Sequence, residues 1–158
     1  MIEMKEKVLI CDSIHEDGVR KLKEAGFIVD EKPTITKEEL FKIVSSYDAI
    51  VVRSRTKITA DILRATSNLK IAARAGVGLD NIDVKEAEAR GVKVINTPEA
   101  PSVAVAELTM GLMLSLVRSI PLADRKIKGG EWIKSQLTGT ELRGKTLGVV
   151  GFGRIGYQ

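Results

Sequence analysis

The sequence has little cysteine: Cys11 is the only one in 158 residues. A single cysteine cannot form an internal disulfide, and it leaves no Cys-x-x-Cys pair for a structural metal or a redox centre. The composition therefore excludes a disulfide framework. It also favours a reducing, cytoplasmic compartment, since disulfides are the usual staples of secreted proteins.

Aromatic residues are also scarce, at 4% of the chain, and the formal net charge of +4 comes from Lys and Arg spread along the sequence. A nucleic-acid-binding surface is expected to cluster basic and aromatic side chains. No nucleic-acid partner is therefore expected. Four prolines and the lack of a long polar tract argue against disorder, and 44% apolar residues are enough for a hydrophobic core.

No hydrophobic run reaches the length of a membrane span. The most apolar stretch, Val103–Val117, contains Glu107 and is shorter than the roughly 20 residues that a spanning helix needs. The apolar run near the start of the chain is too short for a signal peptide. We therefore expect no membrane association, and we interpret residues 103–117 as a helix buried in the protein or at a subunit interface.

Short apolar segments alternate with amphipathic segments over residues 7–96. Strands are predicted at 7–11, 27–30, 49–52, 70–74 and 92–96. In the intervening helices, Thr36 with Glu39 is a capping box, Thr59 is a second predicted cap, and Gly26 and Gly91 mark helix ends. Continuous apolar strands between amphipathic helices are typical of a parallel sheet covered on both faces. The fold class is therefore α/β, with a flavodoxin-like doubly wound parallel sheet over residues 1–97.

This alternation ends at residues 96–102, where Pro98 and Pro101 interrupt the chain. The apolar helix follows, and the chain breaks again at Pro121 and at Gly129–Gly130. A last apolar run, Leu147–Val150, is predicted to be a strand. We place a second domain at residues 98–158 and interpret it as the first elements of a Rossmann-type nucleotide-binding domain.

Three glycines, Gly151, Gly153 and Gly156, follow the last predicted strand in the spacing Gly-x-Gly-x-x-Gly. The first glycine allows a tight turn, the second lets a pyrophosphate approach the backbone, and the third allows a helix to pack closely. A packing turn without a ligand is the alternative. The residue that distinguishes NAD from NADP is expected about 20 positions further on, after Gln158, so the sequence leaves that choice open.

Two other loops suit anions, and each follows a predicted strand. Gly76–Val77–Gly78 offers backbone N–H groups, while Arg53 and Arg55 flank Ser54. Doubly wound sheets bind ligands at the carboxyl ends of their strands, and Arg can bind a carboxylate or phosphate through two hydrogen bonds. The alternatives are an ordinary turn for the glycines and a solvated basic turn for the arginines.

Four ordered motifs resemble those of the D-isomer-specific 2-hydroxyacid dehydrogenases. They are VVRSRTKIT (51–59), RAGVGLDNID (74–83), NTPEAPSVAVAELTMGLMLSLVR (96–118) and GTELRGKTLGVVGFGRIG (139–156). In that family a nucleotide-binding domain interrupts the substrate domain, and the catalytic Arg, Glu and His come from the second half. The resemblance therefore implies no catalytic residue in this chain, which corresponds to the amino-terminal half of such an enzyme. We interpret His15, the only histidine, as a surface residue at the start of a helix.

The resemblance also implies roles for individual residues. Arg53 and Ser54 would contact anionic groups of the substrate. The backbone of Gly76, Val77 and Gly78 would hold its carboxylate, with Val77 also near the nicotinamide.

On the nucleotide side, the resemblance implies that the pyrophosphate of NAD lies on Gly151, Gly153, Arg154, Ile155 and Gly156. Trp132 and Lys134 match an arm that reaches a neighbouring subunit. No metal site is implied. Pro101 and Ala104 depart from the family pattern, which usually has Asn and Ser there.

The reaction implied by the resemblance is NAD-dependent hydride transfer from C2 of a phosphorylated 2-hydroxy acid. The specific expectation is oxidation of D-3-phosphoglycerate to 3-phosphohydroxypyruvate, in serine biosynthesis, by a homodimer or homotetramer. One alternative is another D-2-hydroxyacid dehydrogenase, such as a glyoxylate or hydroxypyruvate reductase. Others are a non-catalytic NAD-sensing scaffold and a free-standing flavodoxin-type ligand-binding module. The apolar helix and the nucleotide loop argue against the last, since both would lack partners.

Overall fold

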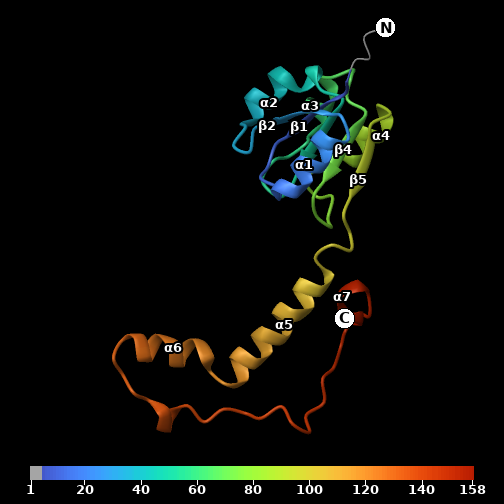
Figure 1. The fold of residues 1–158 in the computed structure, drawn as a ribbon. Helices are drawn as coiled ribbons and strands as arrows, with labels where there is room; N and C mark the ends of the chain where they lie inside the picture. The colour runs from blue at the N-terminus through green and yellow to red at the C-terminus, as the bar shows by residue number, and fades with distance from the viewer. Residues whose placement is uncertain (1–4) are drawn as a thin grey trace. The chain divides into compact units, whose positions relative to one another are not determined.

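The computed structural model describes residues 5–158 and divides the chain into two compact units (Figure 1). The first is Met1–Ala100 and the second is Pro101–Gln158. The division therefore falls shortly after the boundary expected from the sequence, between residues 97 and 98.

The first unit contains a five-stranded parallel sheet. Its strands are β1 (Lys7–Ile10), β2 (Ile28–Glu31), β3 (Ala49–Val52), β4 (Ile71–Arg74) and β5 (Lys93–Asn96). Their order across the sheet is β2-β1-β3-β4-β5. This is the flavodoxin-like order of a doubly wound fold, so the predicted fold class is confirmed.

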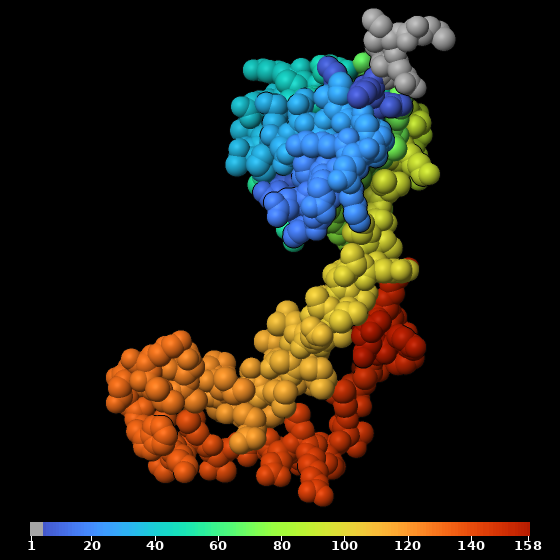
Figure 2. All heavy atoms as spheres, in the orientation of Figure 1, coloured from blue at the N-terminus to red at the C-terminus, as the bar shows by residue number. Residues whose placement is uncertain are grey.

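Helices connect the strands of this sheet. They are α1 (Glu16–Glu24), α2 (Lys37–Ile43), the 3-10 turn η1 (Val44–Ser46), α3 (Ala60–Arg64) and α4 (Val84–Ala89). The core lies between strands and helices, where Leu9, Ile50 and Ala72 of the sheet are fully buried with Ile62 and Leu63 of α3. Figure 2 shows the first unit, blue to yellow-green, as a closed mass of atoms.

The predicted helix ends are mostly confirmed. Thr36 caps α2 with the full capping box to Glu39, and Gly26 follows α1 with φ +95°. His15 is the cap of α1, where its Nδ1 accepts a hydrogen bond from the N–H of Asp17 at 3.2 Å. Thr59 precedes α3 as expected but makes no cap bond, because its hydroxyl donates to the Asp61 carboxylate instead.

The second unit contains α5 (Ser102–Val117), α6 (Ile120–Lys128), the 3-10 turn η2 (Lys134–Gln136) and α7 (Arg154–Tyr157). Between α5 and α6, Ser119 has a left-handed φ of 52°. Within residues 5–158 no single helix is long and apolar enough to cross a membrane. By length and composition α5 and α6 pass that test only together, and they are bent by 66°.

One expectation for the second unit is wrong, and another stays open in part. Residues 147–150 form no strand, and Val150 is fully exposed. A strand is stable only when a neighbour pairs with its backbone, and no described segment pairs with this one. The described chain does not bury α5, since Leu108 and Leu112 are each 61% exposed and Leu116 is 79% exposed. Its burial at a subunit interface stays a prediction.

Candidate functional site

The candidate site of the first unit lies at the carboxyl ends of its strands. Asp12 follows β1, Arg53–Thr56 follows β3, Arg74–Gly78 spans the end of β4, and Asn96–Thr97 closes β5. Because the strands are parallel and β1, β3, β4 and β5 are consecutive neighbours, these segments share one edge of the sheet. This is the edge where doubly wound folds bind ligands.

Asp12 organises the loop after β3. It is 4% exposed, and its carboxylate accepts hydrogen bonds from the N–H groups of Arg53 at 2.6 Å and Thr56 at 3.1 Å, and from the Thr56 hydroxyl at 2.7 Å. Burial acts to raise the pKa of Asp12. The hydrogen bonds from Thr56 and Arg53, together with the Arg55 charge, outweigh that effect and lower the pKa below its ordinary value.

The two arginines of this loop have different environments. The guanidinium of Arg55 donates to the carbonyls of Cys11, Pro33 and Ile35 at 2.7–2.9 Å and pairs with Asp12 at 3.2 Å. Arg55 therefore holds the loop in place, and its guanidinium is bound by the first unit itself. The guanidinium of Arg53 makes no hydrogen bond or ion pair with residues 5–158, and Ser54 beside it is exposed.

The Gly76–Gly78 loop turns its carbonyls toward the end of β5. The carbonyl of Gly76 accepts from the N–H of Thr97 at 3.0 Å, and that of Val77 accepts from Asn96 Nδ2 at 2.6 Å. The N–H of Gly76 donates to the Arg74 carbonyl at 2.9 Å. The N–H groups of Val77 and Gly78 have no partner in the described chain, so two of the three expected donors are available for an anion.

Packing explains why glycine stands at both positions. A Cβ on Gly78 would lie 2.8 Å from the Asp80 carboxylate, and a Cβ on Gly76 would lie 3.1 Å from Arg74 Nε. A larger residue at either position would require the neighbouring side chain to shift, which the Asp80 side chain, 85% exposed, can do more easily than the buried Arg74. Glycine therefore lets both side chains lie close to the loop.

Sequence reasoning missed two residues of this site, Arg74 and Asn81. Arg74 has a side chain only 12% exposed, donates to Asp80 at 3.3 Å and to the Asn81 amide oxygen, and its Nε is buried without a partner among residues 5–158. Asn81 in turn donates to the Thr56 carbonyl at 2.7 Å. An Asn in a turn is common, so the sequence carried no signal that this one bridges two loops.

The nucleotide loop of the second unit shows the three properties that its glycines predict. Gly151 has φ +95°, a Cβ on Gly153 would meet nothing within 4 Å, and a Cβ on Gly156 would lie 2.3 Å from the Gly151 carbonyl oxygen. The first position needs a left-handed turn, the second leaves the backbone open to an approaching group, and the third allows the close approach of α7. These residues therefore fit a dinucleotide pyrophosphate. Arg154 and Ile155 open α7 directly after the loop.

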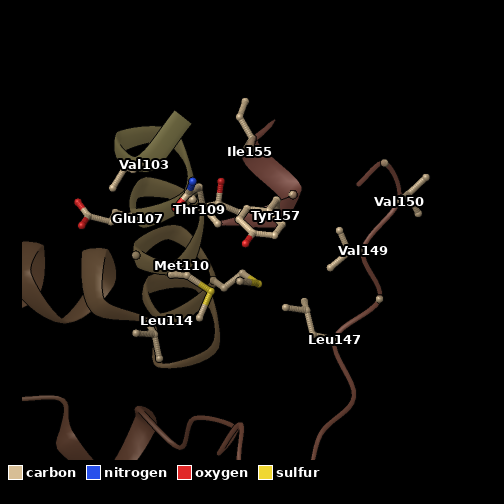
Figure 3. Close-up of a pocket in the computed structure, with 17 residues that line it drawn as sticks. Val103, Glu107, Thr109, Met110, Leu114, Leu147, Val149, Val150, Ile155 and Tyr157 are labelled. Carbon is tan, nitrogen blue, oxygen red and sulfur yellow. The ribbon is translucent and has the colours of Figure 1, made fainter. Parts of the chain in front are cut away.

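A cavity of about 1120 Å³ lies between α5 and residues 147–158 (Figure 3). Met110 and Leu114 of α5 line it opposite Leu147, Val149 and Tyr157. This lining is largely apolar and suits packed polypeptide better than phosphate. Gly151, Ile155 and Gly156 of the glycine loop also line the cavity, so its apolar wall adjoins the loop.

The remaining predicted residues lie on the arm after α6. Trp132 is 78% exposed and Lys134 begins η2, while Ile133 between them is buried. Their predicted contact with a neighbouring subunit stays a prediction. Across residues 5–158, no group of three His, Cys, Asp or Glu side chains is placed to hold a metal ion.

Comparison with known proteins identifies the class. Residues 8–152 match the family model described as D-isomer specific 2-hydroxyacid dehydrogenase, catalytic domain. The match covers most of the chain, and the parallel sheet with its glycine loops agrees with it. The chain therefore belongs to the D-isomer-specific 2-hydroxyacid dehydrogenase family.

Two curated relatives and one solved structure show how similar the chain is to individual members of the family. The chain is 50% identical over 152 residues to D-3-phosphoglycerate dehydrogenase of Methanocaldococcus jannaschii, and 48% identical over 152 residues to hydroxypyruvate reductase of Thermotoga maritima. These alignments cover 96% of this chain but 29% and 50% of the two relatives. The structure of NAD+-bound 3-phosphoglycerate dehydrogenase from Entamoeba histolytica aligns with a TM-score of 0.73 and 31% identity, over 98% of this chain and 49% of that one.

Proposed function

We propose that the protein containing this chain is an NAD-dependent dehydrogenase that oxidises D-3-phosphoglycerate to 3-phosphohydroxypyruvate. One observation carries the choice of substrate. The unpaired guanidinium of Arg53 and the unpaired N–H groups of Val77 and Gly78 belong to the ends of adjacent strands, β3 and β4. A ligand with two anionic groups satisfies both sets of donors at once.

In this proposal the substrate carboxylate accepts from the N–H groups of Val77 and Gly78, and the phosphate pairs with Arg53. The Ser54 hydroxyl is exposed next to Arg53 and supplies a further donor. Arg55 and Asp12 contact no substrate and hold the main chain from which Arg53 projects. The residues of this chain thus bind and orient, while the proton-transferring groups belong to the part of the protein outside it.

For the cofactor, Gly151, Gly153, Arg154, Ile155 and Gly156 are proposed to hold the pyrophosphate. NAD, when bound, supplies the hydride acceptor for C2 of the substrate. The NAD+-bound relative supports NAD as the cofactor. The cytoplasmic location expected from the single cysteine stays a prediction.

The proposed assembly is a homodimer or a dimer of dimers, with a place in serine biosynthesis. Apolar side chains are exposed all around α5, and a helix that is apolar on every side suits burial against two partners. The arm carrying Trp132 and Lys134 is the proposed contact with the second subunit. Light scattering of the full-length protein at micromolar concentration tests this, and a stable monomer contradicts it.

Hydroxypyruvate reductase is the second candidate, because one relative with that name is 48% identical. Hydroxypyruvate has one anionic group and leaves the Arg53 guanidinium unpaired. The two candidates therefore differ in what they require of Arg53. A protein without turnover of either substrate would instead agree with the non-catalytic scaffold.

The test is Arg53→Ala in the full-length protein. Loss of a charge-assisted hydrogen bond typically costs about 1.5–3 kcal/mol, so KM for 3-phosphoglycerate should rise about 10- to 150-fold. The Kd for NADH should barely change. Steady-state kinetics and a fluorescence titration of NADH measure the two quantities.

Lys57→Ala is the matched control, because it removes one exposed positive charge from the same loop. It should change KM less than about twofold. If Arg53→Ala changes KM as little as this control, Arg53 is a solvated residue, and the proposal of a phosphorylated substrate loses its support. Residues 1–158 alone should oxidise no NADH with phosphohydroxypyruvate above a buffer blank.

A further inference from the structure

The side chain of Asn81 joins the two loops of the candidate substrate site. Asn81 is 5% exposed, and its Nδ2 donates to the carbonyls of Thr56 at 2.7 Å and Arg53 at 3.2 Å. Its Oδ1 accepts a hydrogen bond from Nη1 of Arg74. One buried amide therefore connects the loop after β3 to the end of β4.

Backbone bonds hold Asn81 itself in place without help from its side chain. The Asn81 carbonyl accepts from the N–H of Ile58 at 2.8 Å, and the N–H of Asp83 donates back to Ile58 at 2.8 Å. These two bonds form an isolated parallel bridge between Ile58 and Ile82. A substitution of the Asn81 side chain should therefore release the loops while the bridge remains.

We propose that Asn81 is a positioning residue that sets the spacing between Arg53 and the Gly76–Gly78 loop, and thereby favours substrates with two anionic groups. This inference rests on the proposed function. Asn81 restrains the carbonyl of Arg53, and with it the main chain that carries the free guanidinium. It also restrains Arg74, whose Nε lies 3.1 Å from the position of a Cβ on Gly76.

Fixed spacing matters only to a ligand that touches both loops. A substrate with two anionic groups gains from donors that are already held at the right separation, since it does not have to order them on binding. A substrate with one carboxylate uses the glycine loop alone. Loss of Asn81 should therefore harm the first much more than the second.

The experiment compares phosphohydroxypyruvate with hydroxypyruvate as substrates of the full-length protein, followed by NADH absorbance. Asn81→Ala should lower kcat/KM for phosphohydroxypyruvate about 10- to 100-fold, mainly through KM, and lower it less than about threefold for hydroxypyruvate. Asn81→Asp keeps an acceptor for Arg74 but loses both donated bonds, so it should shift selectivity in the same direction. If Asn81→Ala is unfolded at the assay temperature, Asn81→Asp decides the question.

Asn68→Ala is the control for a general loss of stability. Its Nδ2 donates to the Ser45 carbonyl at 2.8 Å, before β4 and so at the opposite edge of the sheet. It should affect both substrates equally. In an Arg53→Ala background, the effect of Asn81→Ala on phosphohydroxypyruvate should shrink to its effect on hydroxypyruvate, because the second anion contact is already gone.

The outcomes separate the two proposals. A wild-type protein that reduces neither substrate overturns the proposed function and this inference with it. An active wild type whose substrate ratio is unchanged by either Asn81 variant overturns the inference alone. Equal losses for both substrates also overturn it, since they indicate a purely structural role.

Discussion

The two units of the chain treat their apolar residues in opposite ways. Of the buried apolar side chains, Ile133 alone among the described residues belongs to the second unit. Among residues 5–158, four large exposed apolar side chains lie in the first unit and eighteen in the second. The first unit thus has a closed core, whereas the second has apolar surface of the kind that another polypeptide covers.

This difference shows which function each unit can support by itself. The first unit places Arg53 and the Gly76–Gly78 loop at the carboxyl ends of its strands. Hydrogen bonds between the main chain and the side chains of Asp12, Arg55 and Asn81 hold this region together. The second unit forms its glycine loop, but α5 and residues 147–150 are not covered by the described chain. The geometry of the proposed substrate loops is therefore set within the first unit, whereas the proposed nucleotide loop depends on further packing.

Cutting the chain between the units should have the largest effect. Residues 1–100 alone should unfold in one cooperative transition, because their core is complete. Residues 101–158 alone should show no cooperative transition and should bind a hydrophobic dye, because they bury almost no apolar area. Thermal melts followed by circular dichroism measure both, and a cooperative melt of the second piece would contradict the comparison.

A matched pair of leucine truncations should sharpen the comparison between the two units. Leu63 in α3 is fully buried, while Leu116 in α5 is 79% exposed. In residues 1–158, Leu63→Ala should lower the free energy of unfolding by about 2–5 kcal/mol. Leu116→Ala should change it by less than about 0.5 kcal/mol.

Urea unfolding at neutral pH measures these two free energies. Leu63→Met serves as the volume-conserving control and should cost less than about 1.5 kcal/mol. Equal costs for the two alanine variants would show that the second unit has a core of its own.

The next largest effect is the pH dependence of the stability that Asp12 contributes. Its pKa is lower in the folded protein than the ordinary value of 3.8, so its contribution to stability is present above about pH 4 and is lost as the pH falls through the lowered pKa. Asp12→Asn should cost about 1.5–3 kcal/mol at pH 7. The difference in the free energy of unfolding between wild type and Asp12→Asn should become smaller below pH 4.

Urea unfolding at several pH values between 7 and 2 checks this. Glu88→Gln, at an exposed position in the same unit, is the control and should show no such pH-dependent difference. The described carboxylates of the second unit are all exposed, so this acid effect should report the first unit alone. If the free energies of unfolding of wild type and Asp12→Asn differ by the same amount at every pH, the role given to Asp12 is contradicted.

The smallest effect on stability is expected at Gly156. A Cβ there would lie 2.3 Å from the Gly151 carbonyl oxygen, so Gly156→Ala should distort the nucleotide loop. The melting transition of residues 1–158 should not move, because the first unit produces it. In the full-length protein, NADH binding should weaken about 5- to 150-fold, the equivalent of about 1–3 kcal/mol of overpacking.

Gly148→Ala is the control, since a Cβ at that position meets nothing within 4 Å. It should leave the Kd for NADH within about twofold of wild type. A fluorescence titration of NADH distinguishes the variants. Normal binding by Gly156→Ala would remove the glycine loop from the proposed cofactor site.

Much of the fold could be predicted because its signals are local. The five strands and the parallel order follow from short apolar runs between amphipathic helices, and the Thr36–Glu39 capping box forms as its spacing indicates. The predicted strand at 147–150 was wrong for the described chain because an apolar run predicts burial, while a strand also needs a neighbour to pair with. Thr59 likewise has the right residue type for a cap, but its hydroxyl bonds to Asp61.

For the candidate site too, some features could be predicted from the sequence and others depend on the tertiary structure. By itself the sequence predicted which loops have residue types suited to anions, because glycines and arginines after strands have that capacity wherever the fold puts them. Only the tertiary structure decided that Arg53 is available while Arg55 is not, since the partners of Arg55 lie at Cys11, Pro33 and Ile35. It also decided the bridging role of Asn81, because a side-chain amide acquires its partners only when the sheet brings the ends of β3 and β4 together.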